Sequence, residues 1–162
     1  MVCLRYAAFK GTSLVSRIIR FWTRSEYSHI AYMTADGELI ECFNHRPWSI
    51  RWGLVDPPFK HHAPGTPCEI WELPVDEAVA LRVDEFMHML AEAEAPYDWL
   101  AVLGFVFKWK KEENGKYFCS EGCAAPLCTE LEWTLPPWRI SPDTFVALIR
   151  ASGAVLVDSL EV

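Results

Sequence analysis

Cys119 is the residue of this sequence best suited to act as a nucleophile. It follows an Asn114-Gly115 turn and begins residues 119–125, whose composition predicts the start of a helix. The unpaired N–H groups and the dipole of a helix N-terminus favour a thiolate and can also stabilise an oxyanion. A buried, inert thiol, the commoner fate of a cysteine, is the alternative. Glu121 lies in the first turn of this helix, and we expect its side chain to point outward.

A cysteine nucleophile needs a base, and the base needs a group that orients it. His29 is the candidate base. It lies on a predicted strand among apolar and aromatic neighbours, where a lone histidine is more often structural than catalytic. Glu41 is the candidate orienting group, because an acid inside an apolar strand requires a partner if it is buried. The remaining histidines fit the role of base less well. They are His45, which follows the strand of Glu41, His61 and His62 in a proline-rich loop, and His88 on a long helix.

The hairpin between the two strands decides whether Glu41 reaches His29. Asp36-Gly37 is a strong signal for the turn of this hairpin. A strict two-residue turn would place Asn44 opposite His29 and Glu41 on the other face of the sheet. A three-residue loop would place Phe43 opposite His29 and Glu41 diagonally from it on the same face. The pattern of residues alone leaves Glu41 and Asn44 both open as the orienting group.

The elements that must position these residues are predicted from hydrophobic periodicity and turn signals. Strands are expected over residues 2–9, 27–33, 39–43, 68–73 and 154–160, and helices over 13–22, 74–95, 97–107, 118–128 and 142–152. Residues 44–67 are rich in proline and predict a loop that holds at most a short strand over 50–52. Ser13 and Ser141 are expected to cap the first and last helices. We expect one domain over residues 1–162, of the α+β class, with helices on an antiparallel sheet.

Composition argues against several classes of protein. Lys and Arg number 15 and Asp and Glu number 22, and the resulting net charge of −7 argues against nucleic-acid binding. The longest apolar run, residues 99–107, is too short for a transmembrane helix. The first residues lack the features of a secretory signal, so we expect a cytoplasmic protein, and a phage or prophage origin fits the same observations. Most of the eight tryptophans are expected in the core, although loop tryptophans such as Trp48 and Trp138 could line a ligand groove.

The six cysteines are expected to be reduced in a cytoplasmic protein. Cys119, Cys123 and Cys128 have a C-x3-C-x4-C spacing, which does not match the paired ligands of a zinc site, so we expect no metal and no cofactor. A redox pair of Cys119 and Cys123 is a weaker alternative, because side chains four residues apart on a helix are poorly aligned for a disulfide.

Residues 28–32, the Asp36-Gly37 turn and residues 39–41 resemble the histidine strand and the following strand of NlpC-type papain-fold hydrolases. In those families a polar orienting residue follows the histidine by the interval seen here, 41 − 29 = 12. The cysteine helix comes after the histidine strand, an order similar to the circularly permuted branch, which includes YiiX-like and lecithin:retinol acyltransferase-like proteins. Residues 96–99 (PYDW) also resemble the tyrosine-aspartate motif of the YiiX-like group.

The resemblance implies a permuted papain-like fold, with an antiparallel sheet or partial barrel packed with helices, and catalysis by the cysteine, histidine and glutamate named above. It favours Glu41 over Asn44 as the orienting group. Tyr97 and Ser120 are then expected to bind the substrate or stabilise the oxyanion. The expected partner is a small-molecule, peptide or lipid acyl substrate, whose amide or ester bond is hydrolysed or whose acyl group is transferred.

The resemblance extends over most of residues 5–130. Within this range the sequence departs from the family pattern at three places. Ala31 stands where glycine is usual, residues 44–67 have no match, and Cys123 has no counterpart. A second class of function therefore remains, a non-catalytic binding or structural module that uses the aromatic residues of the 44–59 loop. A reactive Cys119 thiol near neutral pH would favour the enzyme over this module.

Overall fold

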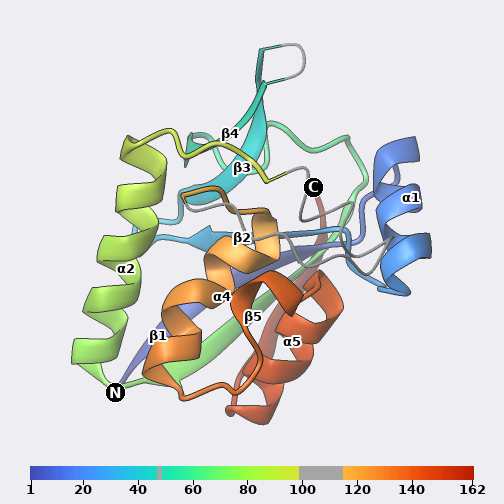
Figure 1. Ribbon diagram of the computed structural model, residues 1–162. Coiled ribbons are helices and arrows are strands. Elements are labelled where there is room, and N and C mark those ends of the chain that lie inside the picture. The colour runs from blue at the N-terminus through green and yellow to red at the C-terminus, as the bar shows by residue number, and fades with distance from the viewer. Residues whose placement is uncertain (47–48, 99–114) are drawn as a thin grey trace.

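The computed structural model describes residues 1–46, 49–98 and 115–162 and contains a six-stranded antiparallel sheet (Figure 1). The strands are β1 (Val2–Phe9), β2 (His29–Met33), β3 (Leu39–Arg46), β4 (Ser49–Val55), β5 (Pro67–Val75) and β6 (Val155–Glu161). Their order across the sheet is β4-β3-β2-β1-β5-β6, so the sheet is open and β1 and β2 occupy its centre. The predicted α+β class, with helices packed on an antiparallel sheet, is confirmed.

The helices of the described residues lie mainly on one face of this sheet. They are α1 (Leu14–Thr23), α2 (Glu77–Glu92), α4 (Cys119–Glu130), the short 3-10 helix η1 (Pro137–Arg139) and α5 (Pro142–Ala151). Figure 1 shows α4 between α2 and α5 in front of the sheet, with α1 off to one side. None of the helices in this part of the chain has the length and apolar character that a membrane crossing requires.

The two serine caps that the sequence predicts are both present. The Ser13 hydroxyl accepts a hydrogen bond from the N–H of Ser16 at the start of α1. The Ser141 hydroxyl accepts one from the N–H of Thr144 at the start of α5. Each cap satisfies a backbone donor that the first turn of a helix leaves without an intrahelical partner.

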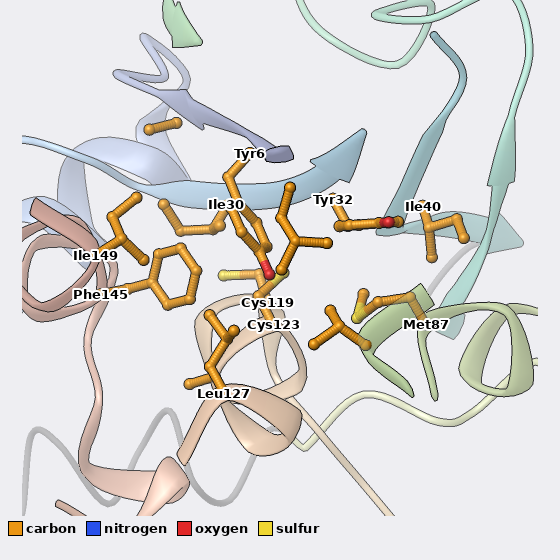
Figure 2. Packing of buried hydrophobic residues seen from close by; sticks show 14 of the residues in the cluster. Tyr6, Ile30, Tyr32, Ile40, Met87, Cys119, Cys123, Leu127, Phe145 and Ile149 are labelled. Atoms are coloured by element: carbon orange, nitrogen blue, oxygen red, sulfur yellow. The ribbon is translucent and has the colours of Figure 1, made fainter. Parts of the chain in front are cut away.

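The main hydrophobic core lies between the sheet and helices α2, α4 and α5 (Figure 2). Because side chains alternate along a strand, Tyr6 of β1 points into this core, whereas its neighbour Ala7 joins a smaller cluster on the other face. The Tyr6 ring packs edge-on against Phe145 of α5, with 5.0 Å between the ring centroids. Figure 2 shows Cys119 and Cys123 of α4 in the middle of this core. The N-terminus of α4 is therefore held against the centre of the sheet.

Residues 44–67 form more strand than their prolines suggest. Strand β3 continues to Arg46, and the residues from Ile50 to Val55 pair with those from Asn44 to Leu39 in a ladder. The prediction of a loop was wrong here because cross-strand pairing is a tertiary contact that stabilises strands with a weak pattern of their own.

The helix predicted over residues 97–107 does not begin where expected. Tyr97 and Asp98 are not helical, and the backbone N–H of Tyr97 donates to the carbonyl of Ile50 at 3.2 Å on the edge of β4. The remainder of that predicted helix lies outside the described residues.

Trp52 of β4 fixes the start of α4. Its side chain is buried, and its indole Nε1 donates to the carbonyl of Tyr117 at 3.0 Å, just before the helix. Its ring also lies so close to Gly122 that a Cβ atom added there would overlap it. A glycine in the first turn of α4 therefore lets the tryptophan and the helix approach each other.

Replacing Gly122 with valine should lower the free energy of unfolding by about 1–3 kcal/mol, the usual cost of overpacking a core. The helix propensity gained by removing a glycine is smaller than this cost. Urea denaturation measures the change, and Thr129→Val places the same side chain at an exposed position of the same helix as a control. Unchanged stability of the Gly122 variant would show that the contact with Trp52 is not tight.

Candidate active site

The β2–β3 hairpin brings His29 and Glu41 together. Tyr32 pairs with Ile40 and Met33 with Leu39, which is the register of the three-residue loop. The loop ends at Gly37, whose positive φ of 86° suits the last position of such a loop. The side chain of Glu41 consequently lies on the same face of the sheet as that of His29.

The contact between these two side chains is short. His29 Nε2 lies 2.9 Å from Glu41 Oε2, and Glu41 is only 1% exposed. Asn44, the other residue that the sequence left open, has an exposed side chain. Of the two candidate orienting groups, it is Glu41 that contacts the histidine.

Cys119 is the first residue of α4, one residue after the start of the helix predicted over 118–128, and its sulfur faces β2. The His29 ring and the backbone N–H groups of Ile30 and Ser120 lie near enough to the thiol to stabilise its charged form. Because Nε2 of His29 is used by Glu41, Nδ1 is the ring nitrogen left for the sulfur. Cys119, His29 and Glu41 thus lie in series, with the thiol beside the imidazole and the imidazole hydrogen-bonded to the carboxylate.

The electrostatics of these three residues favour a charged pair of Cys119 and His29. Burial alone would raise the pKa of the Cys119 thiol, but hydrogen bonding and positive charge from His29, with the two backbone N–H groups, lower it below its usual value. Burial alone would lower the pKa of His29, but Cys119 and Glu41 together raise it to about 10. The pair therefore favours a thiolate beside an imidazolium.

The other buried thiols differ from Cys119. Burial raises the pKa of Cys42 and Cys123 well above the usual value of a thiol. It also raises the pKa of Cys68 to about 12 and that of Cys128 to about 11. Cys119 combines burial with a histidine partner, and this partner lowers the pKa of its thiol.

His62 is a member of this cluster that sequence reasoning set aside. Its Nε2 lies 2.9 Å from Glu41 Oε2, and its ring stacks on Phe9 with 3.7 Å between centroids and 7° between planes. The proline-rich loop after β4 carries it there, and no pattern in the sequence indicates where that loop goes. Burial would raise the pKa of Glu41, but the hydrogen bonds from His29 and His62 lower it to about 2.

The side chains of His29, Glu41 and His62 could together hold a metal ion. Their ligand atoms all lie within 4.8 Å of one another. Zinc bonds of about 2.0–2.1 Å in a tetrahedron place neighbouring ligand atoms about 3.3 Å apart. The two nitrogen–oxygen distances of 2.9 Å are shorter than this, and both end on the same carboxylate oxygen. They match hydrogen bonds from protonated ring nitrogens better than metal coordination.

Tyr97 lies near the nucleophile, and the Ser120 hydroxyl is used elsewhere. After burial, the charge of Cys119 is the largest influence that raises the pKa of Tyr97. The Ser120 hydroxyl is buried and donates its hydrogen to the carbonyl of Ile140 at 2.7 Å. Only the backbone N–H of Ser120 faces the sulfur. Ser120 therefore contributes through its backbone, and its side chain ties α4 to the segment before α5.

The expectation for Glu121 was wrong. Its side chain is buried, and its carboxylate turns back to accept the N–H of Phe118 at 3.2 Å. Capping the first turn of α4 satisfies a backbone donor in the core, which an outward side chain would leave unpaired.

Two of the remaining histidines can be placed. His61 stacks on Phe43 with 4.4 Å between the ring centroids, and His88 lies 3.7 Å from Asp84 on α2. The side chain of His45 lies outside the described part of the chain.

A cavity of about 390 Å³ opens beside this cluster. His29, Glu41 and Tyr97 contribute to its wall. Its apolar lining includes Phe9, Ile19, Phe43 and Ile50. A substrate with an apolar portion could therefore reach the histidine from this side.

The chain matches no protein-family model, and a search of curated proteins finds no match. The resemblance to permuted papain-fold hydrolases is therefore carried by the residues and their spacing alone.

Cys119 should react with iodoacetamide faster than the other five cysteines at pH 6–7. Its lowered pKa provides thiolate at a pH where an ordinary thiol, with a pKa of about 8.5, is mostly protonated. Removing the partner in His29→Ala should slow the reaction, and Glu41→Gln should slow it less because the imidazole remains. Peptide mapping after limited alkylation gives the order of reactivity. Equal labelling of all accessible cysteines, independent of His29, would mean that the thiol is not activated.

Stability in acid should depend on Glu41. Its pKa is about 2 in the folded chain against 4.5 in the unfolded chain, so ionised Glu41 stabilises the fold fully above pH 4.5. This stabilisation is lost as the pH falls towards 2. The difference in unfolding free energy between the natural chain and Glu41→Gln should therefore shrink over that range. Glu92→Gln, at an exposed position, serves as the control, and a pH-independent Glu41 difference would contradict the assignment.

Proposed function

We propose that this protein is a cysteine hydrolase or acyltransferase of permuted papain-like fold. The observation that carries the proposal is the thiol at the start of α4, beside a histidine that is itself held by a buried carboxylate. This order of nucleophile, base and orienting acid is the arrangement that nucleophilic catalysis requires.

In the first half-reaction, the Cys119 sulfur attacks the carbonyl carbon of an ester or amide. The carbonyl electrons move to oxygen, and the resulting oxyanion can accept hydrogen bonds from the backbone N–H of Cys119 and from the hydroxyl of Tyr97. When the intermediate collapses, the bond to the leaving group breaks, and His29 donates its proton to that group. A thioester between the acyl group and Cys119 remains.

In the second half-reaction, His29 removes a proton from water or from an acceptor molecule, which then attacks the thioester. Water gives hydrolysis, and an alcohol or amine acceptor gives acyl transfer. The tetrahedral intermediate collapses, its carbon–sulfur bond breaks to release the acylated product, and the proton on His29 returns to the departing sulfur. Glu41 holds the imidazole in one orientation throughout and favours its protonated form.

The substrate class follows from the chemistry and from the resemblance. A peptide amide, a lipid acyl ester or a small acyl compound would each present the required carbonyl. The apolar side chains in the cavity beside His29 suit an acyl group with hydrocarbon character.

Turnover of p-nitrophenyl acetate should depend on Cys119. Cys119→Ala should abolish enzymatic turnover, and His29→Ala should lower kcat by at least about a hundredfold, the usual contribution of a positioned base. Mass spectrometry of the acid-quenched protein should show one acetyl group, on Cys119.

Cys128→Ala is the matched control, because Cys128 is a half-buried thiol at the far end of the same helix. Persistence of turnover and acetylation in Cys119→Ala would exclude Cys119 as the nucleophile, and absence of turnover in the natural chain would exclude the enzyme. The latter result would favour instead a binding module with the same fold.

A further inference from the structure

We propose that His62 is a positioning residue of this site, which holds the Glu41 carboxylate in the place from which it orients His29. The inference rests on the proposed function, because it assigns a role within the same catalytic chain. His62 comes from the loop between β4 and β5, so the proposal makes that loop part of the active site.

The first argument is that both histidines contact the same oxygen of the Glu41 carboxylate. Oε2 of Glu41 lies 2.9 Å from Nε2 of both His29 and His62, whereas Oε1 is buried with no hydrogen-bond partner among the described residues. A carboxylate held by one donor can rotate about its terminal bond and exchange its two oxygens. Two donors that reach one oxygen from different segments prevent this rotation. His62 thereby fixes the position of the acceptor that His29 uses.

The second argument is that His62 is itself firmly placed. Its ring stacks on Phe9 with 3.7 Å between centroids, and its side chain is 13% exposed. Phe9 lies directly opposite His29 in the β1–β2 ladder, so the same phenylalanine lies beside both histidines. The end of the loop is anchored as well, because Thr66 pairs with Val162 through backbone hydrogen bonds in both directions.

The third argument concerns protons. A carboxylate only accepts hydrogen bonds, so each histidine must carry a hydrogen on Nε2 to bind Oε2. In His29 this leaves Nδ1 to take and return the proton of Cys119. Loss of His62 would loosen the carboxylate and, through it, the ring of His29. The effect should fall on the proton-transfer steps, and therefore on kcat, more than on the binding of a small ester.

The test compares His62→Leu with His62→Gln in the full-length chain, with p-nitrophenyl acetate as the probe. Leucine fills the space but has no donor, and we expect kcat to fall by about tenfold to a hundredfold, as for other residues that orient a catalytic ligand. KM should change little. Glutamine offers an N–H at a similar reach and should restore most of the lost kcat. Alkylation of Cys119 by iodoacetamide should persist in both variants, because His29 still faces the thiol.

Two control substitutions leave the cluster untouched. His88→Leu makes the same change on the outer side of α2, and Lys60→Ala alters an exposed residue of the same loop. Both should keep the kcat of the natural chain.

The outcomes separate this inference from the proposed function. If Cys119→Ala is inactive but His62→Leu keeps its kcat, the positioning role is wrong and the enzyme stands. If Cys119→Ala keeps its activity, the proposed function itself fails. If glutamine is as damaging as leucine, the donor is not what matters, and the inference is overturned. One zinc ion per chain in the purified protein, lost in both His62 variants, would also overturn it, in favour of a metal site formed by His29, Glu41 and His62.

Discussion

The buried carboxylate of Glu41 is the group on which the whole site depends. An ionised carboxylate that is 1% exposed would be strongly destabilising without partners, and two imidazole rings supply them. These partners come from β2 and from the loop between β4 and β5, while Glu41 itself lies on β3. Satisfying one charge therefore ties together three segments of the chain, and Phe9 of β1 adds a fourth through its stacking on His62.

The nucleophile is placed by a separate set of contacts on the other side of the histidine. Trp52 holds the backbone just before α4, Glu121 caps its first turn, and the Ser120 hydroxyl ties it to the segment before α5. None of these side chains takes part in the proposed chemistry. Together they set the helix N-terminus against β2, so that the buried sulfur lies beside His29 and two backbone N–H groups.

The two halves of the site influence each other through charge. The negative carboxylate stabilises an imidazolium, and the imidazolium stabilises a thiolate, so the raised pKa of His29 and the lowered pKa of Cys119 have a common origin. Among the described residues, no histidine lowers the pKa of the buried Cys42 and Cys123, and burial is the largest cause of their raised pKa. Position relative to one histidine, and not burial, distinguishes the thiol whose pKa is lowered.

Local sequence was sufficient to predict several of these features. The limits of β1, the serine caps of α1 and α5, and the start of α4 at Cys119 all follow from patterns within a few residues, because caps and turns are local interactions. The Asp36-Gly37 turn signal left two possible registers for the hairpin, one with Glu41 and one with Asn44 near His29. The strand ladder selected the three-residue loop, since only that register brings the acid to the face of the histidine.

Tertiary structure alone decided the rest. Strand β4 exists because β3 offers it a partner, and the inward turn of Glu121 follows from the burial of the helix start. His62 has no neighbour in sequence that could mark it as part of the site, because its partners Glu41 and Phe9 lie on two other strands. Types and spacing of residues determine which side chains are able to do chemistry. The tertiary fold determines which of these side chains are in contact, because residues far apart in sequence approach each other only when the whole chain is folded.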